Sequence, residues 1–279
     1  MTGRAVAPVA PGAQSCRVRA HGFAVAVTTI GLWAVALAQA ASAADTTLRV
    51  AVNEANGRPF ALYDRDGNFT GGLARDVIDP LARELGLRVE YLNLPRARVE
   101  TWLHDGRIDA ACFLAPDWVA EPQRFRWSPV LFRIRQVVVS PPGAPPVTAP
   151  EALYGRRLGT QLNYAYPELQ AYFADGRIRR ADAPSIAANI AKLERGRIDA
   201  FLYDDIAAPY AVRDGRLPAQ ARIDPLWAPD NPVHCAFNRG FAQRHRRWQG
   251  LLMGAVAAGR IERAIAGYTG GRGKAGGAP

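Results

Sequence analysis

Polar and aromatic side chains follow several predicted buried strands, where a small-molecule site would form. Asn53 and Glu54 end the first predicted strand, residues 116–118 follow a later one, and Tyr203 and Asp204 end a third. In a sheet of parallel strands the carboxyl ends meet at one edge, beside loops and helix N-termini that bind ligands. These residues are therefore candidates for binding a small polar solute.

Residue patterns typical of catalysis or metal binding are absent from the sequence. It contains no Gly-x-Ser-x-Gly elbow, no His-Glu-x-x-His, no Cys-x-x-Cys and no Walker loop. His234 lies beside Cys235 in a predicted strand. Because neighbouring strand residues point to opposite faces, the two make a poor nucleophile–base pair. We expect no catalytic residue, no metal site and no cofactor.

Two tyrosines, Tyr164 and Tyr166, follow a predicted strand at 158–162. Together with Trp118 and Phe60 they could enclose a ligand between aromatic rings. Core packing is the alternative, because it is the more common fate of aromatic side chains.

The composition indicates a globular chain without a nucleic-acid partner. Hydrophobic residues make up 49% of the sequence, enough for a sizeable core, which excludes a disordered chain. The formal net charge is +10. The basic residues are scattered singly, however, and form no stripe with interleaved aromatics of the kind that nucleic-acid binding requires.

The N-terminal segment has the layout of a secretory signal peptide. Arginines precede an uncharged apolar run at 23–37, and small residues follow it. Cleavage after Ala43 would remove a signal peptide at 1–43 and place the protein in the periplasm. An uncleaved anchor is the alternative, because the run is nearly long enough to span a bilayer. The mature chain would keep two cysteines, Cys112 and Cys235.

A repeated segment organises the chain. The sequence Gly-Arg-Ile-Asp-Ala occurs at 106–110 and at 196–200, each time after a helical pattern and before a short apolar strand. In the second copy Ser185 is a candidate N-cap, and apolar residues recur at helical spacing. Because the same helix–glycine–strand unit occurs twice, we expect two similar α/β lobes with mainly parallel sheets.

The remaining pattern is consistent with this arrangement. Alternation and turn residues predict further strands, and apolar periodicity predicts helices. The predicted strands lie at 47–53, 87–91, 108–114, 158–162 and 232–237, with a long apolar run at 131–139, and the helical segments lie at 73–85 and 241–268.

The order and spacing of these segments resemble the family-three extracellular solute-binding proteins of ABC importers, over about residues 46–268. The resemblance rests on the Pro-Phe-x-x-x-Asp-x-x-Gly turn at 59–67, the paired repeat segments and the Trp-Ser-x-Pro-like crossover at 127–129. It implies an α/β, two-lobed periplasmic-binding-protein fold of type II, with two crossover strands and a ligand cleft between the lobes.

The resemblance also implies how the chain is divided. Lobe I would be discontinuous, at 44–135 and 230–268, and lobe II would span 136–229. A Gly-rich, disordered tail would follow at 269–279.

The resemblance places Asp204 where amino-acid-binding members hold the α-ammonium group of the ligand; capping of the following helix is the alternative. The arginine that clamps the ligand's carboxylate in those members is replaced by Glu121, and the accompanying threonine by Trp118. Arg98 or Arg96 could substitute. The candidate ligand-binding residues are thus Asp204, Arg98, Tyr164, Tyr166, Trp118, Glu54 and Phe60.

The resemblance further places the strand of Cys112 next to that of Cys235, which would allow a disulfide between them. Two buried free thiols are the alternative.

By this resemblance the chain is a monomeric periplasmic protein that delivers a small polar, amino-acid-like solute to an ABC permease in the inner membrane. Two alternatives remain open: a ligand sensor without an importer, and a dehydratase on the same fold. In the enzyme, Glu54, Asp117 or Glu121 would be the general acid.

Overall fold

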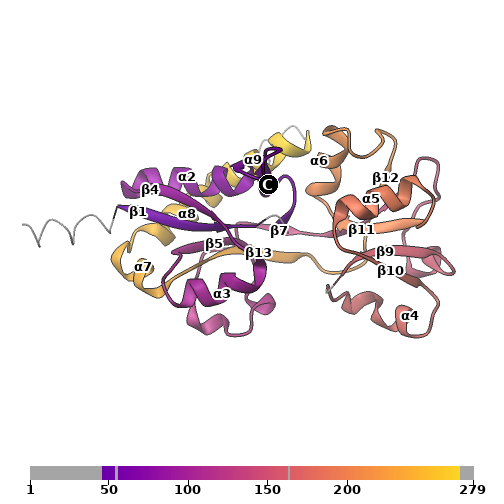
Figure 1. Cartoon of the computed structure of the whole chain (residues 1–279), viewed down its shortest axis with the longest axis horizontal. Helices are drawn as coiled ribbons and strands as arrows, with labels where there is room; N and C mark the ends of the chain where they lie inside the picture. The colour runs from indigo at the N-terminus through magenta and orange to yellow at the C-terminus, as the bar shows by residue number, and fades with distance from the viewer. Residues whose placement is uncertain (1–45, 54–55, 163, 271–279) are drawn as a thin grey trace, which may run out of the picture. The chain divides into compact units, whose positions relative to one another are not determined.

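The structure is a computed structural model that describes residues 46–53, 56–162 and 164–270. The described residues belong to one compact unit. The predicted signal peptide at 1–43 and residues 271–279 of the predicted tail lie outside the described residues. Within the described ranges the chain forms two large sheets flanked by helices (Figure 1).

The first sheet is built from β1 (Thr47–Val52), β4 (Arg88–Asn93), β5 (Ala110–Leu114), β6 (Arg126–Trp127), β7 (Phe132–Ile134) and β13 (Asn231–Phe237). Its strand order is β4-β1-β5-β13-β6, and β7 also pairs with β13. Strands β1, β4 and β5 are parallel, and β13 runs antiparallel to β5. A hairpin of β2 (Leu62–Tyr63) and β3 (Phe69–Gly71) follows β1.

The second sheet repeats this topology with β8 (Gln136–Ser140), β9 (Arg157–Gln161), β10 (Arg179–Ala183), β11 (Ala200–Asp204) and β12 (Arg222–Pro225). Its order is β10-β9-β11-β8-β12, with β8 antiparallel to β11. In each sheet three parallel strands are thus followed by one antiparallel strand. The two similar lobes expected from the sequence repeat are confirmed.

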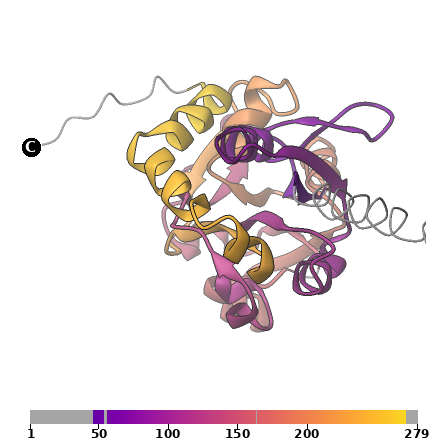
Figure 2. The same ribbon diagram turned by 90° about the vertical axis from the view of Figure 1, so that its left-hand side faces the viewer.

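Helices cover both faces of each sheet, and we call each sheet with its helices a lobe. In lobe I, α2, α8 and α9 lie on one face and α3 on the other (Figures 1 and 2). Alternate residues of β1 divide accordingly, since Val50 packs with the α2 side and Ala51 with the α3 side. The helices are α2 (Leu73–Leu85), α3 (Arg96–His104), α7 (Arg239–Arg244), α8 (Trp248–Ala257) and α9 (Arg260–Thr269) in lobe I, and α4 (Gln170–Ala174), α5 (Ile186–Glu194) and α6 (Ala207–Arg213) in lobe II.

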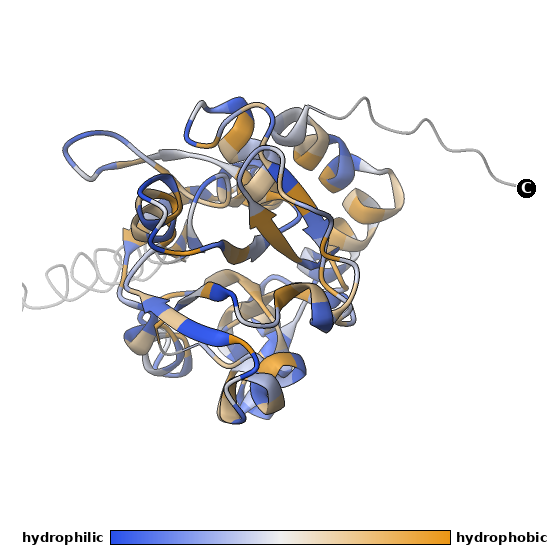
Figure 3. Ribbon diagram, turned by 90° about the vertical axis from the view of Figure 1, so that its right-hand side faces the viewer, coloured by the Kyte–Doolittle hydropathy of each residue, from blue (hydrophilic) through white to orange (hydrophobic). Residues whose placement is uncertain are grey.

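Helix α9 continues through Thr269, the first residue of the predicted tail. In lobe II, hydrophobic residues colour the central strands, and hydrophilic residues are frequent on the surrounding helices and loops (Figure 3). No helix of the described residues is long and apolar enough to cross a membrane.

Two crossover segments connect the lobes. The apolar run at 131–139 is divided into β7 and β8, which belong to different sheets, with Arg135 between them. The second crossover runs from β12 to β13. The Arg135 guanidinium donates from Nε to Asp230 Oδ1 over 2.5 Å and from Nη2 to Oδ2 over 3.0 Å. This ion pair therefore joins the two crossovers.

An arginine–aspartate pair occurs at the same place in both lobes. In lobe I, Arg49 of β1 donates from Nε and Nη2 to the Asp109 carboxylate, over 2.9 Å each, and from Nη2 to the Gly106 carbonyl. In lobe II, Arg157 of β9 makes the same bonds to Asp199 and Gly196. Both glycines have positive φ, which places their carbonyls within reach of the guanidinium. The repeated sequence thus encodes the same connection twice, between β1 and the start of β5 and between β9 and the start of β11.

Cys112 of β5 and Cys235 of β13 form a disulfide. The two residues face each other in the antiparallel register, but His234 pairs with Leu114 rather than with Phe113. Phe113 is therefore the extra residue of a β-bulge next to the disulfide.

The two arginine–aspartate pairs have the same geometry but differ in burial, so together they test how burial affects the contribution of such a pair to stability. The Asp109 side chain is 3% exposed and that of Asp199 is 35% exposed. We expect Asp109→Ala to lower the free energy of unfolding by about 3–4 kcal/mol, because it leaves buried donors without an acceptor, and Asp199→Ala by about 1 kcal/mol. Urea unfolding measures both values, and equal losses would contradict this assignment.

The disulfide predicts that protein starting at residue 44 has no free thiol. Titration of denatured, unreduced protein with a thiol reagent checks this, and non-reducing gels exclude intermolecular dimers. Because the bond closes a loop with a sequence separation of 123 residues, its reduction should lower the free energy of unfolding by up to about 4–5 kcal/mol. Two free thiols per chain would show that the bond does not form.

Candidate functional site

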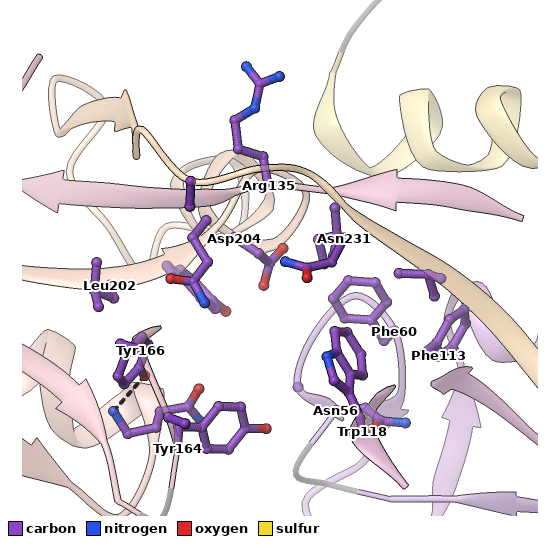
Figure 4. Close-up of a pocket in the computed structure, with 18 of the residues that line it drawn as sticks. Asn56, Phe60, Phe113, Trp118, Arg135, Tyr164, Tyr166, Leu202, Asp204 and Asn231 are labelled. Carbon is purple, nitrogen blue, oxygen red and sulfur yellow. Dashed lines mark hydrogen bonds between the residues drawn. The ribbon is translucent and has the colours of Figure 1, made fainter. Parts of the chain in front are cut away.

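A cleft of about 600 Å³ lies at the carboxyl ends of the parallel strands and is lined by residues of both lobes and of the first crossover. Figure 4 shows its interior, with Phe60, Phe113 and Trp118 on the lobe I side and Tyr164 and Tyr166 on the lobe II side. The structure therefore brings together residues that the sequence placed after separate strands.

Asp204 ends β11 and lines the cleft. Its Oδ1 accepts hydrogen bonds from the backbone N–H groups of Ile206, over 3.1 Å, and Ala207, over 2.7 Å, at the start of α6. The two interpretations of this residue are therefore compatible, since its carboxylate caps the helix and also lies against the cleft. Asn231, the first residue of β13, lines the same cleft (Figure 4).

Four predicted aromatic residues line the cleft, but they differ in burial. Trp118 and Tyr164 are 46% and 50% exposed, unusual values for large aromatic side chains, and so have surface available to a ligand. Phe60 and Tyr166 are buried and belong to the lobe cores. The Tyr166 hydroxyl accepts a hydrogen bond from the Gln161 N–H, so both proposed roles, core packing and cleft lining, apply to Tyr166.

Phe113 also lines the cleft, and sequence reasoning missed it. As the bulge residue of β5 it has φ of 64°, a left-handed conformation that costs a non-glycine residue about 1–3 kcal/mol. Its ring packs on Phe60 at a centroid distance of 5.2 Å and on Phe132 at 6.0 Å. The sequence holds no signal for this role, because Phe113 lies in a run of apolar residues that predicts an ordinary core strand.

Two arginines line the cleft, and both are engaged within the protein. Arg96 donates from Nη1 to Glu100 Oε1 over 2.9 Å and from Nη2 to the Trp118 carbonyl over 3.1 Å. The Arg135 guanidinium is held by Asp230 and points away from the cavity (Figure 4).

Arg98 is exposed and is not among the cleft residues, in contrast to the role predicted for it. Helix α3 begins at Arg96, so at 3.6 residues per turn Arg98 lies on a different side of the helix from Arg96.

Asp117 and Glu121, two other carboxylates considered from the sequence, do not line the cleft. Glu54 lies outside the described residues. Asp117 and Glu121 are exposed and absent from the lining, and Glu121 pairs with Arg124 over 2.9 Å. Glu168, which the sequence analysis did not single out, does line the cleft. Within the described ranges no group of acidic, histidine or cysteine side chains could hold a metal ion.

Comparisons with known proteins identify the fold. No protein-family model and no curated protein matches the sequence. A substrate-binding protein of an ABC uptake transporter from Streptococcus pneumoniae, solved with bound histidine, has a TM-score of 0.66 at 13% identity, over 85% of this chain and 98% of that one. The fold is that of a type II periplasmic binding protein.

Proteins with other roles share this fold. A histidine kinase sensor domain similar to periplasmic binding proteins matches with a TM-score of 0.63 at 19% identity, over 80% of this chain and 96% of that one. An ancestral amino-acid-binding protein that is a precursor of cyclohexadienyl dehydratase matches with 0.62 at 18% identity, over 84% and 99%. At these sequence identities the similarity shows the fold alone, so the function has to be inferred from the residues of the site.

Burial raises the pKa of the Asp204 carboxyl from its ordinary value of 3.8 to about 7, and the charge of Asp205 adds to this. The two backbone N–H bonds act in the opposite direction but do not compensate. No cationic side chain of the described residues forms an ion pair with it. Asp204 is therefore only about half ionised at neutral pH, and a cationic ligand would stabilise its ionised form.

This raised pKa predicts a pH-dependent cost to stability. The folded state holds the Asp204 proton between about pH 4 and pH 7 while the unfolded state loses it, so stability falls as pH rises through that range. Ligand-free Asp204→Asn should therefore be more stable than wild type at pH 8, by on the order of 1–3 kcal/mol, with little difference at pH 4. Urea unfolding at both pH values, with Asp117→Asn as the control, measures this. A variant that is less stable at pH 8 would contradict the assignment.

Proposed function

We propose that this chain is a solute receptor that binds a small, amine-bearing polar molecule in its cleft. After export to the periplasm it would deliver this solute to an ABC permease in the inner membrane. One observation carries the proposal: the Asp204 carboxylate lies against an aromatic-lined cleft and has no cationic partner among the described residues. A buried anion in a concave, largely apolar site is suited to an ammonium group.

Ligand binding would favour closure of the lobes about the two crossovers. In this proposal lobe I comprises residues 44–135 and 230–268 and lobe II residues 136–229, so the Arg135–Asp230 pair lies at the hinge. The ligand can shift the equilibrium only by its higher affinity for the closed arrangement. Contacts to both lobes, such as Trp118 from one and Tyr164 from the other, would supply that difference.

Delivery to a permease is supported by the similar uptake-transporter protein, and sensing by the similar kinase domain. The genes adjacent to this one distinguish the two roles. A permease and an ATPase gene would support delivery, and a sensor kinase gene would support signalling.

An enzyme is the second candidate function, because a carboxyl group with a pKa of about 7 can act as a general acid at neutral pH. Here Asp204, rather than Asp117 or Glu121, would be the acid. Incubation with cyclohexadienyl acids, followed by absorbance of the aromatic product, tests this activity with Asp204→Asn as the comparison.

A thermal-shift screen of amino acids, amines and small carboxylates tests the receptor proposal. A ligand at 100 times its Kd should stabilise the protein by about 2.7 kcal/mol. Asp204→Asn should weaken binding of that ligand by about 1.5–3 kcal/mol, the scale of a charge-assisted hydrogen bond, whereas Asp117→Asn should not change it. Stabilisation that is equal in wild type and Asp204→Asn would remove Asp204 from the site, and no stabilisation by any amine-bearing compound would count against the proposal.

A further inference from the structure

We infer that the cleft selects organic cations that carry no carboxylate: amines rather than α-amino acids. This inference rests on the proposed function and narrows its ligand class. It comes from the charged groups that line the cleft and from which of them are already paired.

The positive charges of the cleft are neutralised by the protein itself. Arg96 is bonded to Glu100 and to the Trp118 carbonyl, so two of its three nitrogens are engaged. Arg135 forms two parallel bonds to Asp230, and its guanidinium points away from the cavity (Figure 4). A ligand carboxylate would therefore have to break an existing ion pair to gain a bidentate arginine contact.

The negative charges of the cleft have no such partners. Asp204 and Glu168 both line it, and neither forms an ion pair within the described part of the chain. Arg180, whose guanidinium lies 5.6 Å from the centroid of the Tyr166 ring, is bonded to Asp182 and to the Tyr164 carbonyl. Although the whole chain is basic, the unpaired charge in its cleft is negative.

The neutral lining suits the same ligand class. Exposed Trp118 and Tyr164 offer aromatic faces on which a cation is stabilised by the ring quadrupole. Four amide side chains also line the cleft, those of Asn56, Gln136, Gln161 and Asn231, and amide oxygens can accept hydrogen bonds from an ammonium group. Among the described lining residues a ligand carboxylate would meet two acids and no unpaired cation. An amino acid should therefore gain less binding free energy than the amine made from it by removal of CO₂.

Matched pairs of compounds test this inference directly. Isothermal titration of the purified protein at pH 8 would compare tyramine with tyrosine, histamine with histidine, and agmatine with arginine. At least one amine should bind with a Kd at least tenfold lower than its amino acid. Asp204→Asn should raise that Kd by about ten- to a hundredfold, and the matched variant Asp117→Asn should leave it unchanged.

The outcomes separate this inference from the proposed function. Tighter binding of the amino acid in every pair that binds would overturn the inference and leave the receptor function standing. Binding of an amine that is insensitive to Asp204→Asn would also overturn it, provided that circular dichroism shows the variant to be folded. Failure of all three amines to bind would overturn it too, and the broader thermal-shift screen would then decide the receptor function alone.

Discussion

The arrangement of both sheets depends on one ion pair that the chain uses twice. Arg49 with Asp109 connects β1 to the residue just before β5, and Arg157 with Asp199 connects β9 to the residue just before β11. The pair fixes the residue at which β5 or β11 starts, and so the place where that strand ends. Because β5 and β11 end at the cleft, the same pair sets the positions of the residues that follow them. Asp109 is almost fully buried in this role, where an isolated carboxylate would be strongly unfavourable.

Local pairing also explains how an arginine-rich chain has an acidic cleft. Most arginines that come near the cleft are held by a carboxylate of the same region, as Arg135 is by Asp230 and Arg96 by Glu100. These residues also position parts of the chain. The Arg135–Asp230 pair joins the two crossovers, and Arg96 and Glu100 connect α3 to the loop carrying Trp118. The charge available to a ligand is therefore set by which groups remain unpaired, and the net charge of the chain does not predict it.

The elements and the general position of the site could be predicted from the sequence, because both follow from local rules. Helix α5 begins after Ser185, whose Oγ accepts a bond from the Ala188 N–H, as its N-cap position predicted. The location of Asp204 at the cleft follows from its place at a strand end. Which arginine lines the cleft could not be predicted, because it depends on the residue at which α3 begins.

The pairing of strands that are far apart in the sequence accounts for the other differences between the predicted and the observed structure. The role of Phe113 depends on the pairing of β5 with a strand more than a hundred residues away, and a bulge in that pairing leaves no trace in local sequence. Likewise, the division of the run at 131–139 depends on which sheet each half joins, and both halves are equally apolar. Such features are decided by partners that the neighbouring residues do not reveal.

The discontinuous strand order of lobe I has a consequence for the timing of chain assembly. The second sheet is complete once Pro225 is available, because all of its strands lie between 136 and 225. The first sheet lacks β13, the strand between β5 and β6, until residue 237, although its other strands are complete by residue 134. Lobe II can therefore form from a continuous stretch while the first half of lobe I waits, with Cys112 unpaired. The part of the protein that emerges first is thus the last to be finished, and an oxidant that acts early meets a single thiol whose partner has not yet arrived.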